Sequence, residues 1–99
     1  MKMAFVVCNR FFTDVVMDIL QEQKIDYFTS WDRATGKGRS TEGHFGSGGE
    51  SSTLSVTMIA FENDAPLEAL IRDIKGANQE IPRVADHIRL FQLPLERIV

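Results

Sequence analysis

The chain contains little cysteine and no long apolar stretch. Cys8 is its single cysteine among 99 residues, so no disulfide can close within the chain. Residues 1–5 lack the apolar run and the small-residue cleavage site of a secretion signal. The longest near-apolar run, residues 3–8, is much shorter than the roughly 20 residues that a membrane-spanning helix needs. We therefore expect a cytoplasmic protein.

Positive charge is also scarce. Eleven Lys and Arg stand against 14 Asp and Glu, which gives a net charge of -3 and no overall field that would attract a nucleic-acid backbone. Phe28 and Trp31 beside Arg33 have the character of a base-stacking surface, but the same residues suit a core or a subunit interface. We expect no nucleic-acid partner. With 43% hydrophobic and 25% charged residues, the composition is that of one folded domain spanning residues 1–99.

Motifs of catalysis are missing as well. The sequence has no nucleophile elbow and no Walker motif. Cys8 together with His44 or His87 would offer a thiol and a base, but a reactive cysteine needs an exposed, electropositive setting, and Cys8 lies at the end of an apolar run. We predict that the chain is not an enzyme and keep a small ferredoxin-like enzyme as an alternative.

The first half of the chain reads as strand, helix, strand. Residues 3–8 predict a buried strand. Thr13 is a suitable N-cap for a helix that ends near Lys24, with an apolar stripe along one side. The stripe consists of Val15, Val16, Ile19 and Leu20. Residues 25–33 are rich in aromatic and β-branched types and predict a second strand.

The second half repeats the pattern as strand, helix, strand. Residues 54–61 alternate and predict a third strand. Asp64 is a suitable N-cap for a helix whose apolar residues recur at i, i+3, i+4 and i+7, and Gly76 is placed to end it. A last strand is expected over residues 87–93. The order predicts a ferredoxin-like βαββαβ sandwich, an α+β fold with a four-stranded antiparallel sheet and two helices on one face.

Two short helices leave the other sheet face without a cover. We expect oligomerisation through it, because the aromatic residues exceed what two helices readily bury. They are Phe5, Phe28, Trp31, Phe61 and Phe91.

Glycine is concentrated in one segment. Six of the seven glycines lie between Thr35 and Ser52, which predicts a long loop at about residues 35–52. Loops of this length without structure of their own are uncommon in compact domains and usually functional.

These features resemble the PII-like family of signalling proteins over nearly the whole chain. The turn at residues 9–12 and the helix after it resemble the family's first turn and helix. Gly36-Lys37-Gly38-Arg39 followed by Gly43-His44 resembles the Gly-x-Gly-Arg-Gln-x-Gly-His opening of the family's T-loop, with one extra residue. Residues 62–67 resemble the turn into the family's second helix.

The resemblance implies a homotrimer that binds a small effector at clefts between subunits and presents a mobile T-loop to a target protein, such as a membrane transporter or an enzyme. The effector would be an adenine nucleotide or another anion. Glycine N–H groups and nearby cations suit an anion. On the family's pattern, the ligand-binding candidates are Arg33, Gly36, Lys37, Gly38, Arg39, Lys75, Arg83 and Arg89.

The chain departs from the family after its second helix. The family holds a nucleotide phosphate there with a Thr-Gly-x-x-Gly-Asp-Gly loop, whereas residues 76–84 keep a single glycine. Ser40 stands where the T-loop has a glutamine, and no loop tyrosine is present. We therefore expect a divergent member whose effector is held differently.

A metal-responsive protein is the alternative. His44 with Glu42 or Glu50 would suit a divalent metal, and the same sandwich occurs in the divalent-cation tolerance (CutA-like) proteins.

Overall fold

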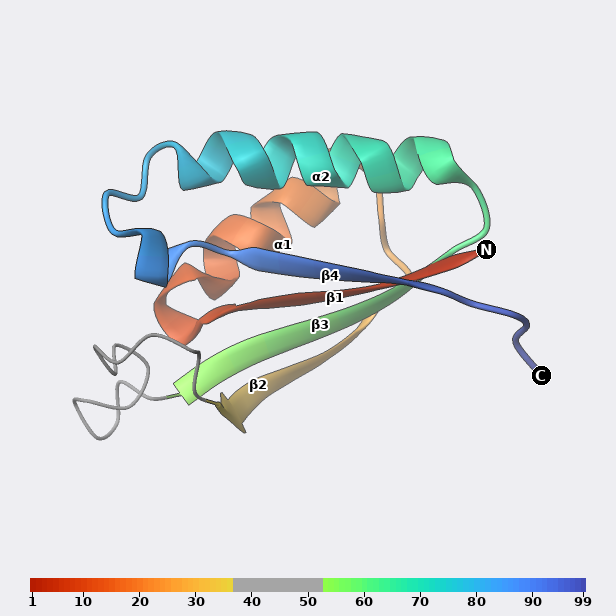
Figure 1. Ribbon diagram of the computed structural model, residues 1–99, viewed down its shortest axis with the longest axis horizontal. Coiled ribbons are helices and arrows are strands. Elements are labelled where there is room, and N and C mark those ends of the chain that lie inside the picture. Colours follow the sequence, from red (N-terminus) through yellow and green to blue (C-terminus); the bar gives the residue numbers. More distant parts are fainter. Residues whose placement is uncertain (37–52) are drawn as a thin grey trace.

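The computed structural model describes residues 1–36 and 53–99. The described chain runs through eight elements in the predicted order (Figure 1). They are β1 (Lys2–Asn9), η1 (Arg10–Phe12), α1 (Thr13–Glu22), β2 (Thr29–Thr35), β3 (Thr53–Phe61), α2 (Asp64–Asn78), η3 (Val84–Asp86) and β4 (Arg89–Pro94).

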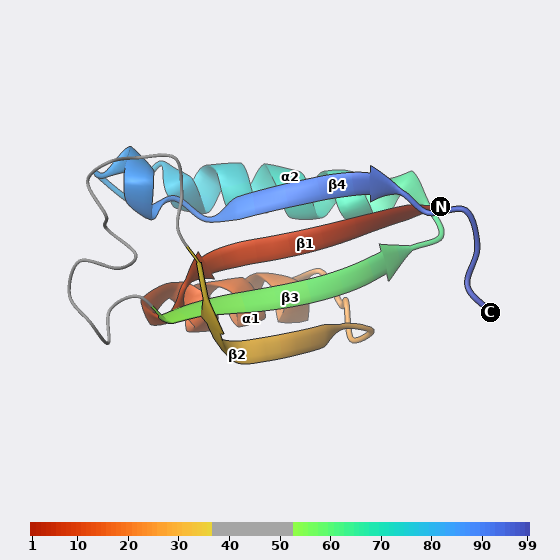
Figure 2. The same ribbon diagram turned by 60° about the horizontal axis from the view of Figure 1, so that its bottom comes forward.

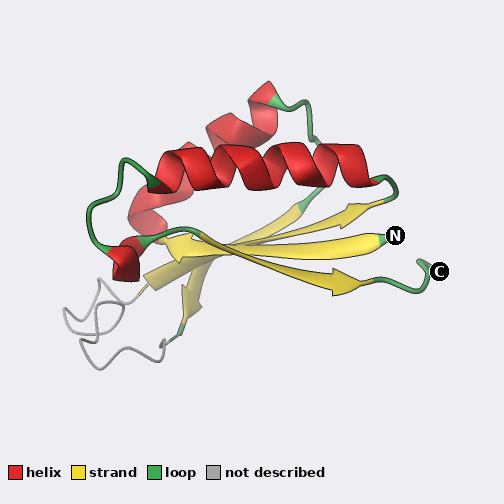
Figure 3. Ribbon diagram, turned by 45° about the horizontal axis from the view of Figure 1, so that its top comes forward, coloured by secondary structure: helices red, strands yellow, loops and turns green. Residues whose placement is uncertain are grey.

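The four strands form one antiparallel sheet in the order β2-β3-β1-β4. β1 lies inside it and pairs with β3 along its whole length, from Lys2↔Phe61 to Asn9↔Leu54. Both helices lie on the same face of the sheet (Figure 3). Turning the molecule shows the opposite face, over which neither α1 nor α2 lies (Figure 2). The predicted ferredoxin-like fold is therefore confirmed.

The core lies between the sheet and the helices. Alternate residues of β1 point into it, so Ala4, Val6 and Cys8 are at most 1% exposed while their neighbours are only partly buried. The helices contribute the residues of their apolar stripes. The buried helical residues are Val16, Ile19, Leu20, Leu67, Leu70 and Ile74.

Two local expectations about α1, the N-cap and the place of Val15, were wrong. Thr13 is the first residue of the helix and not its N-cap, because η1 leads straight into α1 and Phe12 occupies the cap. Val15 is 37% exposed and does not belong to the buried stripe. The helix ends at Glu22, after which Lys24 adopts a left-handed backbone with φ 59°.

The second strand starts later than predicted. Ile25 is 3% exposed because it packs in the core under the helices, and its N–H donates to the carbonyl of Leu20 at 2.9 Å. The chain therefore stays beside α1 before β2 begins at Thr29. The ends of α2 also differ from the prediction: Asn63 occupies the N-cap, so Asp64 is the first helical residue, and the helix runs past Gly76 to Asn78.

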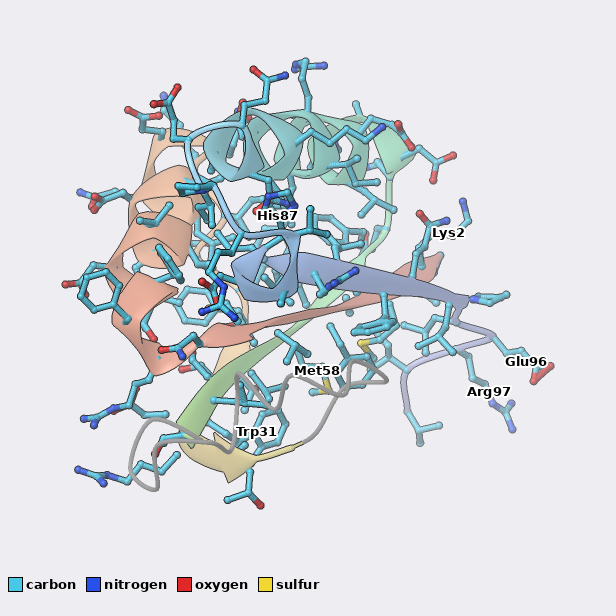
Figure 4. The ribbon with its side chains drawn as sticks, turned by 60° about the vertical axis from the view of Figure 1, so that its left-hand side comes forward. Lys2, Trp31, Met58, His87, Glu96 and Arg97 are labelled. Atoms are coloured by element: carbon cyan, nitrogen blue, oxygen red, sulfur yellow. The ribbon has the colours of Figure 1, made fainter. Side chains whose placement is uncertain are left out.

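The sheet face opposite the helices, which we call the open face, is largely apolar. The register places Phe5 between Met58 and Phe91, and Val7 opposite Val56. Met3 faces Leu93, and Trp31 faces Val56. Trp31, Phe91 and Leu93 are 47%, 55% and 46% exposed. Trp31 and Met58 lie on this side of the sheet, away from the helices (Figure 4).

Of the aromatic residues expected on an interface, Phe61 is different. It is 1% exposed and belongs to the core, where Tyr27 packs edge-on against it at 6.1 Å between ring centroids. The helices therefore cover Phe61, while Trp31 and Phe91 keep about half of their surface exposed.

The burial of Cys8 predicts a chemically inert thiol. Burial raises the pKa of Cys8 to about 11, so almost no thiolate, the reactive form, exists at pH 8. We expect an aromatic disulfide reagent at pH 8 to label the folded protein only at the rate at which the core opens, and to label it at once in denaturant. Stoichiometric labelling of the folded protein within seconds would contradict this burial.

The raised pKa of Cys8 in the folded state also makes the free energy of unfolding depend on pH. The contribution of the protonated thiol is fully present below about pH 9, the pKa of an unperturbed cysteine, and is lost as the pH rises from about 9 toward 11.

Candidate functional site

The candidate site residues gather at one end of the sheet. Antiparallel pairing brings the ends of β1 and β2 to the same side as the beginnings of β3 and β4. We call this the loop end of the sheet, marked by Asn9, Thr35, Thr53 and Arg89. The short helix η3 lies at this end too (Figure 1).

The β2 edge of the loop end carries Arg33 and Gly36. Pairing with β3 is irregular between Trp31 and Ala34, so Asp32 and Arg33 form a bulge. Arg33 is exposed. A Cβ placed on Gly36 would come within 2.7 Å of Cδ1 of Leu54, a buried side chain. The glycine thus lets the chain pass close to β3 where β2 ends.

An ion pair joins β2 to the corner after β1. Nε of Arg10 lies 3.4 Å from Oδ2 of Asp32. Both side chains are substantially exposed, so we assign the pair less than about 1 kcal/mol of stability. It fixes the position of η1 relative to the bulge.

A hollow of about 440 Å³ opens beside this ion pair. Its volume is that of a small-molecule site. Phe11 at its rim is 83% exposed, and Oγ1 of Thr13 is buried there with no hydrogen-bond partner among residues 1–36 and 53–99. Two carboxylates and one guanidinium line it, so the hollow does not favour a simple anion. Its lining residues are Asn9, Arg10, Phe11, Thr13, Asp14, Asp32 and Thr53.

The β4 edge carries the second basic group. Arg83 and Arg89 flank η3, and both are tied to it. Nε of Arg83 lies 3.9 Å from Oδ2 of Asp86, and Nη2 of Arg89 donates to the carbonyl of Val84 at 3.5 Å. We call residues 83–89 the arginine turn. Both arginines are exposed, so this turn offers positive charge to a ligand at the loop end.

The arginine turn is closed by hydrogen bonds to the end of α2. Nδ2 of Asn78 donates to the carbonyl of Ile88 at 2.9 Å, and Oδ1 of Asn78 accepts from the N–H of Ile88 at 2.8 Å. Nε2 of His87 lies 2.9 Å from the carbonyl of Ile81, which requires a proton on that nitrogen. The view of side chains places His87 at the end of α2 nearest the turn (Figure 4).

The predicted site residues therefore fall into two groups within one chain. Arg33 and Gly36 lie at the β2 edge, whereas Arg83 and Arg89 lie at the β4 edge, with β3 and β1 between them. Lys75 is exposed in the last turn of α2. Four predicted residues lie outside the described residues: Lys37, Gly38, Arg39 and His44.

The described residues hold no cluster suited to a metal. In residues 1–36 and 53–99, no three side chains of His, Cys, Asp or Glu come together. His44, the residue on which the metal alternative depended, is not described. Within the same ranges, no helix is long and apolar enough to cross a bilayer.

Sequence reasoning missed Arg10, Asp32 and Asn78. Only the paired hydrogen bonds of Asn78 with Ile88, ten residues away, reveal its role. The ion pair of Arg10 with Asp32 depends on the bulge in β2. Neither feature has a sequence pattern of its own.

Comparison with known proteins supports the fold through structure alone. No protein-family model matches the sequence, and no curated protein matches it either. Among solved structures, CPII from Thiomonas intermedia K12, a nitrogen regulatory PII-like protein bound to ADP, AMP and bicarbonate, is similar with a TM-score of 0.67 at 15% identity, over 93% of this chain and 82% of that chain.

Two further structures of CPII give the same result. The apo form is similar with a TM-score of 0.65 at 13% identity, over 93% of this chain and 85% of that chain. The form bound to ADP and bicarbonate is similar with a TM-score of 0.65 at 14% identity, over 97% and 88%. The resemblance stated from the sequence is therefore confirmed at the level of the fold: the chain folds as PII-like proteins do.

The two described glycines predict opposite effects on stability. Gly36→Ala places a methyl group against Cδ1 of Leu54, the end of a side chain that has to shift, and we expect the free energy of unfolding to fall by about 0.5–1.5 kcal/mol. Gly76→Ala places a methyl group in open space within α2, and we expect a gain of about 0.5–1 kcal/mol. Chemical denaturation of both variants measures this difference. Equal shifts in the two variants would contradict the close approach at Gly36.

Proposed function

We propose that the protein is a divergent PII-like signalling protein of the cytoplasm. It forms a homotrimer, binds a small anionic effector between subunits at the loop end of the sheet, and regulates a target protein through the T-loop that joins β2 to β3. The target belongs to the class of membrane transporters or enzymes, and the protein itself catalyses no reaction. The observation that carries this proposal is the pair of basic groups at one end of the sheet, on its two opposite edges.

The open face supports the trimer. A sheet face that leaves Trp31, Phe91 and Leu93 about half exposed is unfavourable in water, and burial against other copies removes that cost. A closed ring is the usual solution for identical chains, and in a ring of three each chain offers two different surfaces to its neighbours.

A ring of this kind supports a shared effector site. Each interface would bring the β2 edge of one chain, with Arg33 and Gly36, toward the β4 edge of the next, with Arg83 and Arg89. Cations from both chains would then surround one anion. The charge of the arginine turn would replace the phosphate-holding glycine loop that this chain lacks.

The likeness to CPII suggests which anions to test. CPII is described in complex with ADP, AMP and bicarbonate. ADP brings both an aromatic base and a charged phosphate chain, and guanidinium groups bind phosphate through paired hydrogen bonds. ADP with and without bicarbonate is therefore the first effector to test on this chain.

An effector bound at the loop end would also affect the conformation of the T-loop directly. β2 ends at Thr35 and β3 begins at Thr53, so a ligand held at these strand ends contacts the base of the loop. A ligand that favours one arrangement of the loop base shifts the population toward it. This is how a binding protein without catalysis passes on a signal.

The assembly depends on the open face. We predict that light scattering of the purified protein gives three times the mass of one chain. Phe91→Asp places a charge on the open face, on the edge strand β4 beside Phe5, and should yield monomers. Val15→Asp, at an exposed apolar residue on the helix side, should leave the trimer intact. A monomeric native protein, or a trimeric Phe91→Asp variant, would contradict the proposed assembly.

Mixed trimers test whether the site is shared. Arg33→Gln removes charge from the β2 edge and Arg89→Gln removes it from the β4 edge, and each homotrimer should bind ADP at least about tenfold more weakly by calorimetry. Trimers refolded from a mixture of the two variants contain interfaces in which both intact edges meet.

We expect such mixtures to recover a fraction of full-affinity sites. Mixtures that bind no better than the two parent variants would show that the site lies within one chain. A native protein with no ADP-dependent heat would reject ADP as the effector.

A further inference from the structure

Asn78 occupies an unusual position for a residue at the end of a helix. Its backbone carbonyl accepts the N–H of Ile81 at 3.0 Å, while its side chain turns away to pair with Ile88. The side-chain amide gives one donor and one acceptor to the same residue, at 2.9 and 2.8 Å, as a neighbouring strand would. The amide therefore pairs with both backbone groups of the residue that directly precedes β4.

Those two hydrogen bonds close the segment that carries the arginine turn. Ile81 and Ile88 are 8% and 2% exposed, so both ends of the segment are anchored in the core. His87 adds a bond to the carbonyl of Ile81, and Asp86 N–H donates to the carbonyl of Arg83 at 2.9 Å. The residues between the two anchors are held on the surface in one compact turn.

Arg89 follows Ile88 directly in the chain. Its backbone position is thus set by the residue that Asn78 holds, and its guanidinium reaches back to Val84 inside the same turn. Within the turn, Nε of Arg83 lies 3.9 Å from Oδ2 of Asp86, and Nη2 of Arg89 lies 3.5 Å from the carbonyl of Val84. Surface contacts of this length are weak, so the backbone of the turn is needed to hold the two arginines in place.

We propose that Asn78 is a positioning residue for effector binding: it holds the arginine turn so that Arg83 and Arg89 face the ligand together. The inference rests on the proposed function and adds a residue to it that does not contact the ligand. In the PII-like family a glycine-rich loop holds the phosphate in this region, and here the two hydrogen bonds of the Asn78 amide would hold the arginine turn in a fixed shape instead. A chain with one glycine in residues 76–84 could thus still offer a preorganised anion site.

Two substitutions separate the two hydrogen bonds. Asn78→Ala removes both, and Asn78→Asp keeps the acceptor for the N–H of Ile88 but loses the donor to its carbonyl. Asn63→Ala is the matched control, because Asn63 is exposed at the opposite end of α2 and its side chain caps nothing. All three are measured as full-length protein, with ADP as the probe.

The affinity measurement distinguishes positioning from general destabilisation. We expect Asn78→Ala and Asn78→Asp to weaken ADP binding by at least about tenfold, and Asn63→Ala by less than about twofold. In an Arg89→Gln background, where half of the arginine pair is missing, Asn78→Ala should weaken binding much less than in the native protein. An equal loss in both backgrounds would show that Asn78 does not act through Arg89, and would overturn the proposal.

Amide hydrogen exchange of the ligand-free protein gives an independent test. Exchange at Ile88 should rise by at least about tenfold in Asn78→Ala and remain unchanged in Asn63→Ala. Unchanged exchange at Ile88 in Asn78→Ala would overturn the proposal whether or not ADP binds. If the native protein binds no ADP, the proposed effector fails, and the exchange result alone decides whether Asn78 holds the turn.

Discussion

Two helices can cover only one face of a four-stranded sheet, and the other face of this sheet is apolar. The strands direct Ala4, Val6 and Cys8 toward the helices, which leaves Phe5 and its neighbours on the open face. Trp31, Phe91 and Leu93 stay about half exposed there. An exposed apolar face favours association with other copies, and the proposed effector site between the edges of neighbouring sheets depends on such an association.

The edges matter because each carries a different part of the basic charge. Arg33 lies on the edge strand β2 and Arg89 on the edge strand β4, at the same end of the sheet. Neither group alone resembles a ligand site, and the hollow beside Arg10 is lined by carboxylates as well. Sharing between chains would turn two weak basic groups into one strong site, and would make effector binding depend on the assembly.

Much of the fold was predictable because its signals are local. Alternation in β3 and the helical spacing of Leu67, Leu70 and Ile74 gave the correct elements. The errors occurred where tertiary contacts override local preference. Ile25 was assigned to a strand, but core packing holds it beside α1, and Gly76 lies inside a helix that continues to Asn78. The charged candidates Arg83 and Arg89 were predicted from the sequence. Asn78 was not, because its hydrogen bonds to Ile88, ten residues away, produce no recurring pattern in the sequence.

The central claim is that the effector lies between two chains. A crystal structure of the protein grown with ADP and bicarbonate tests it most directly. The account predicts a ring of three in which each ADP contacts the β2 edge of one subunit and the arginine turn of the next. An ADP enclosed by residues of a single chain, or an assembly in which the open faces stay uncovered, would contradict it.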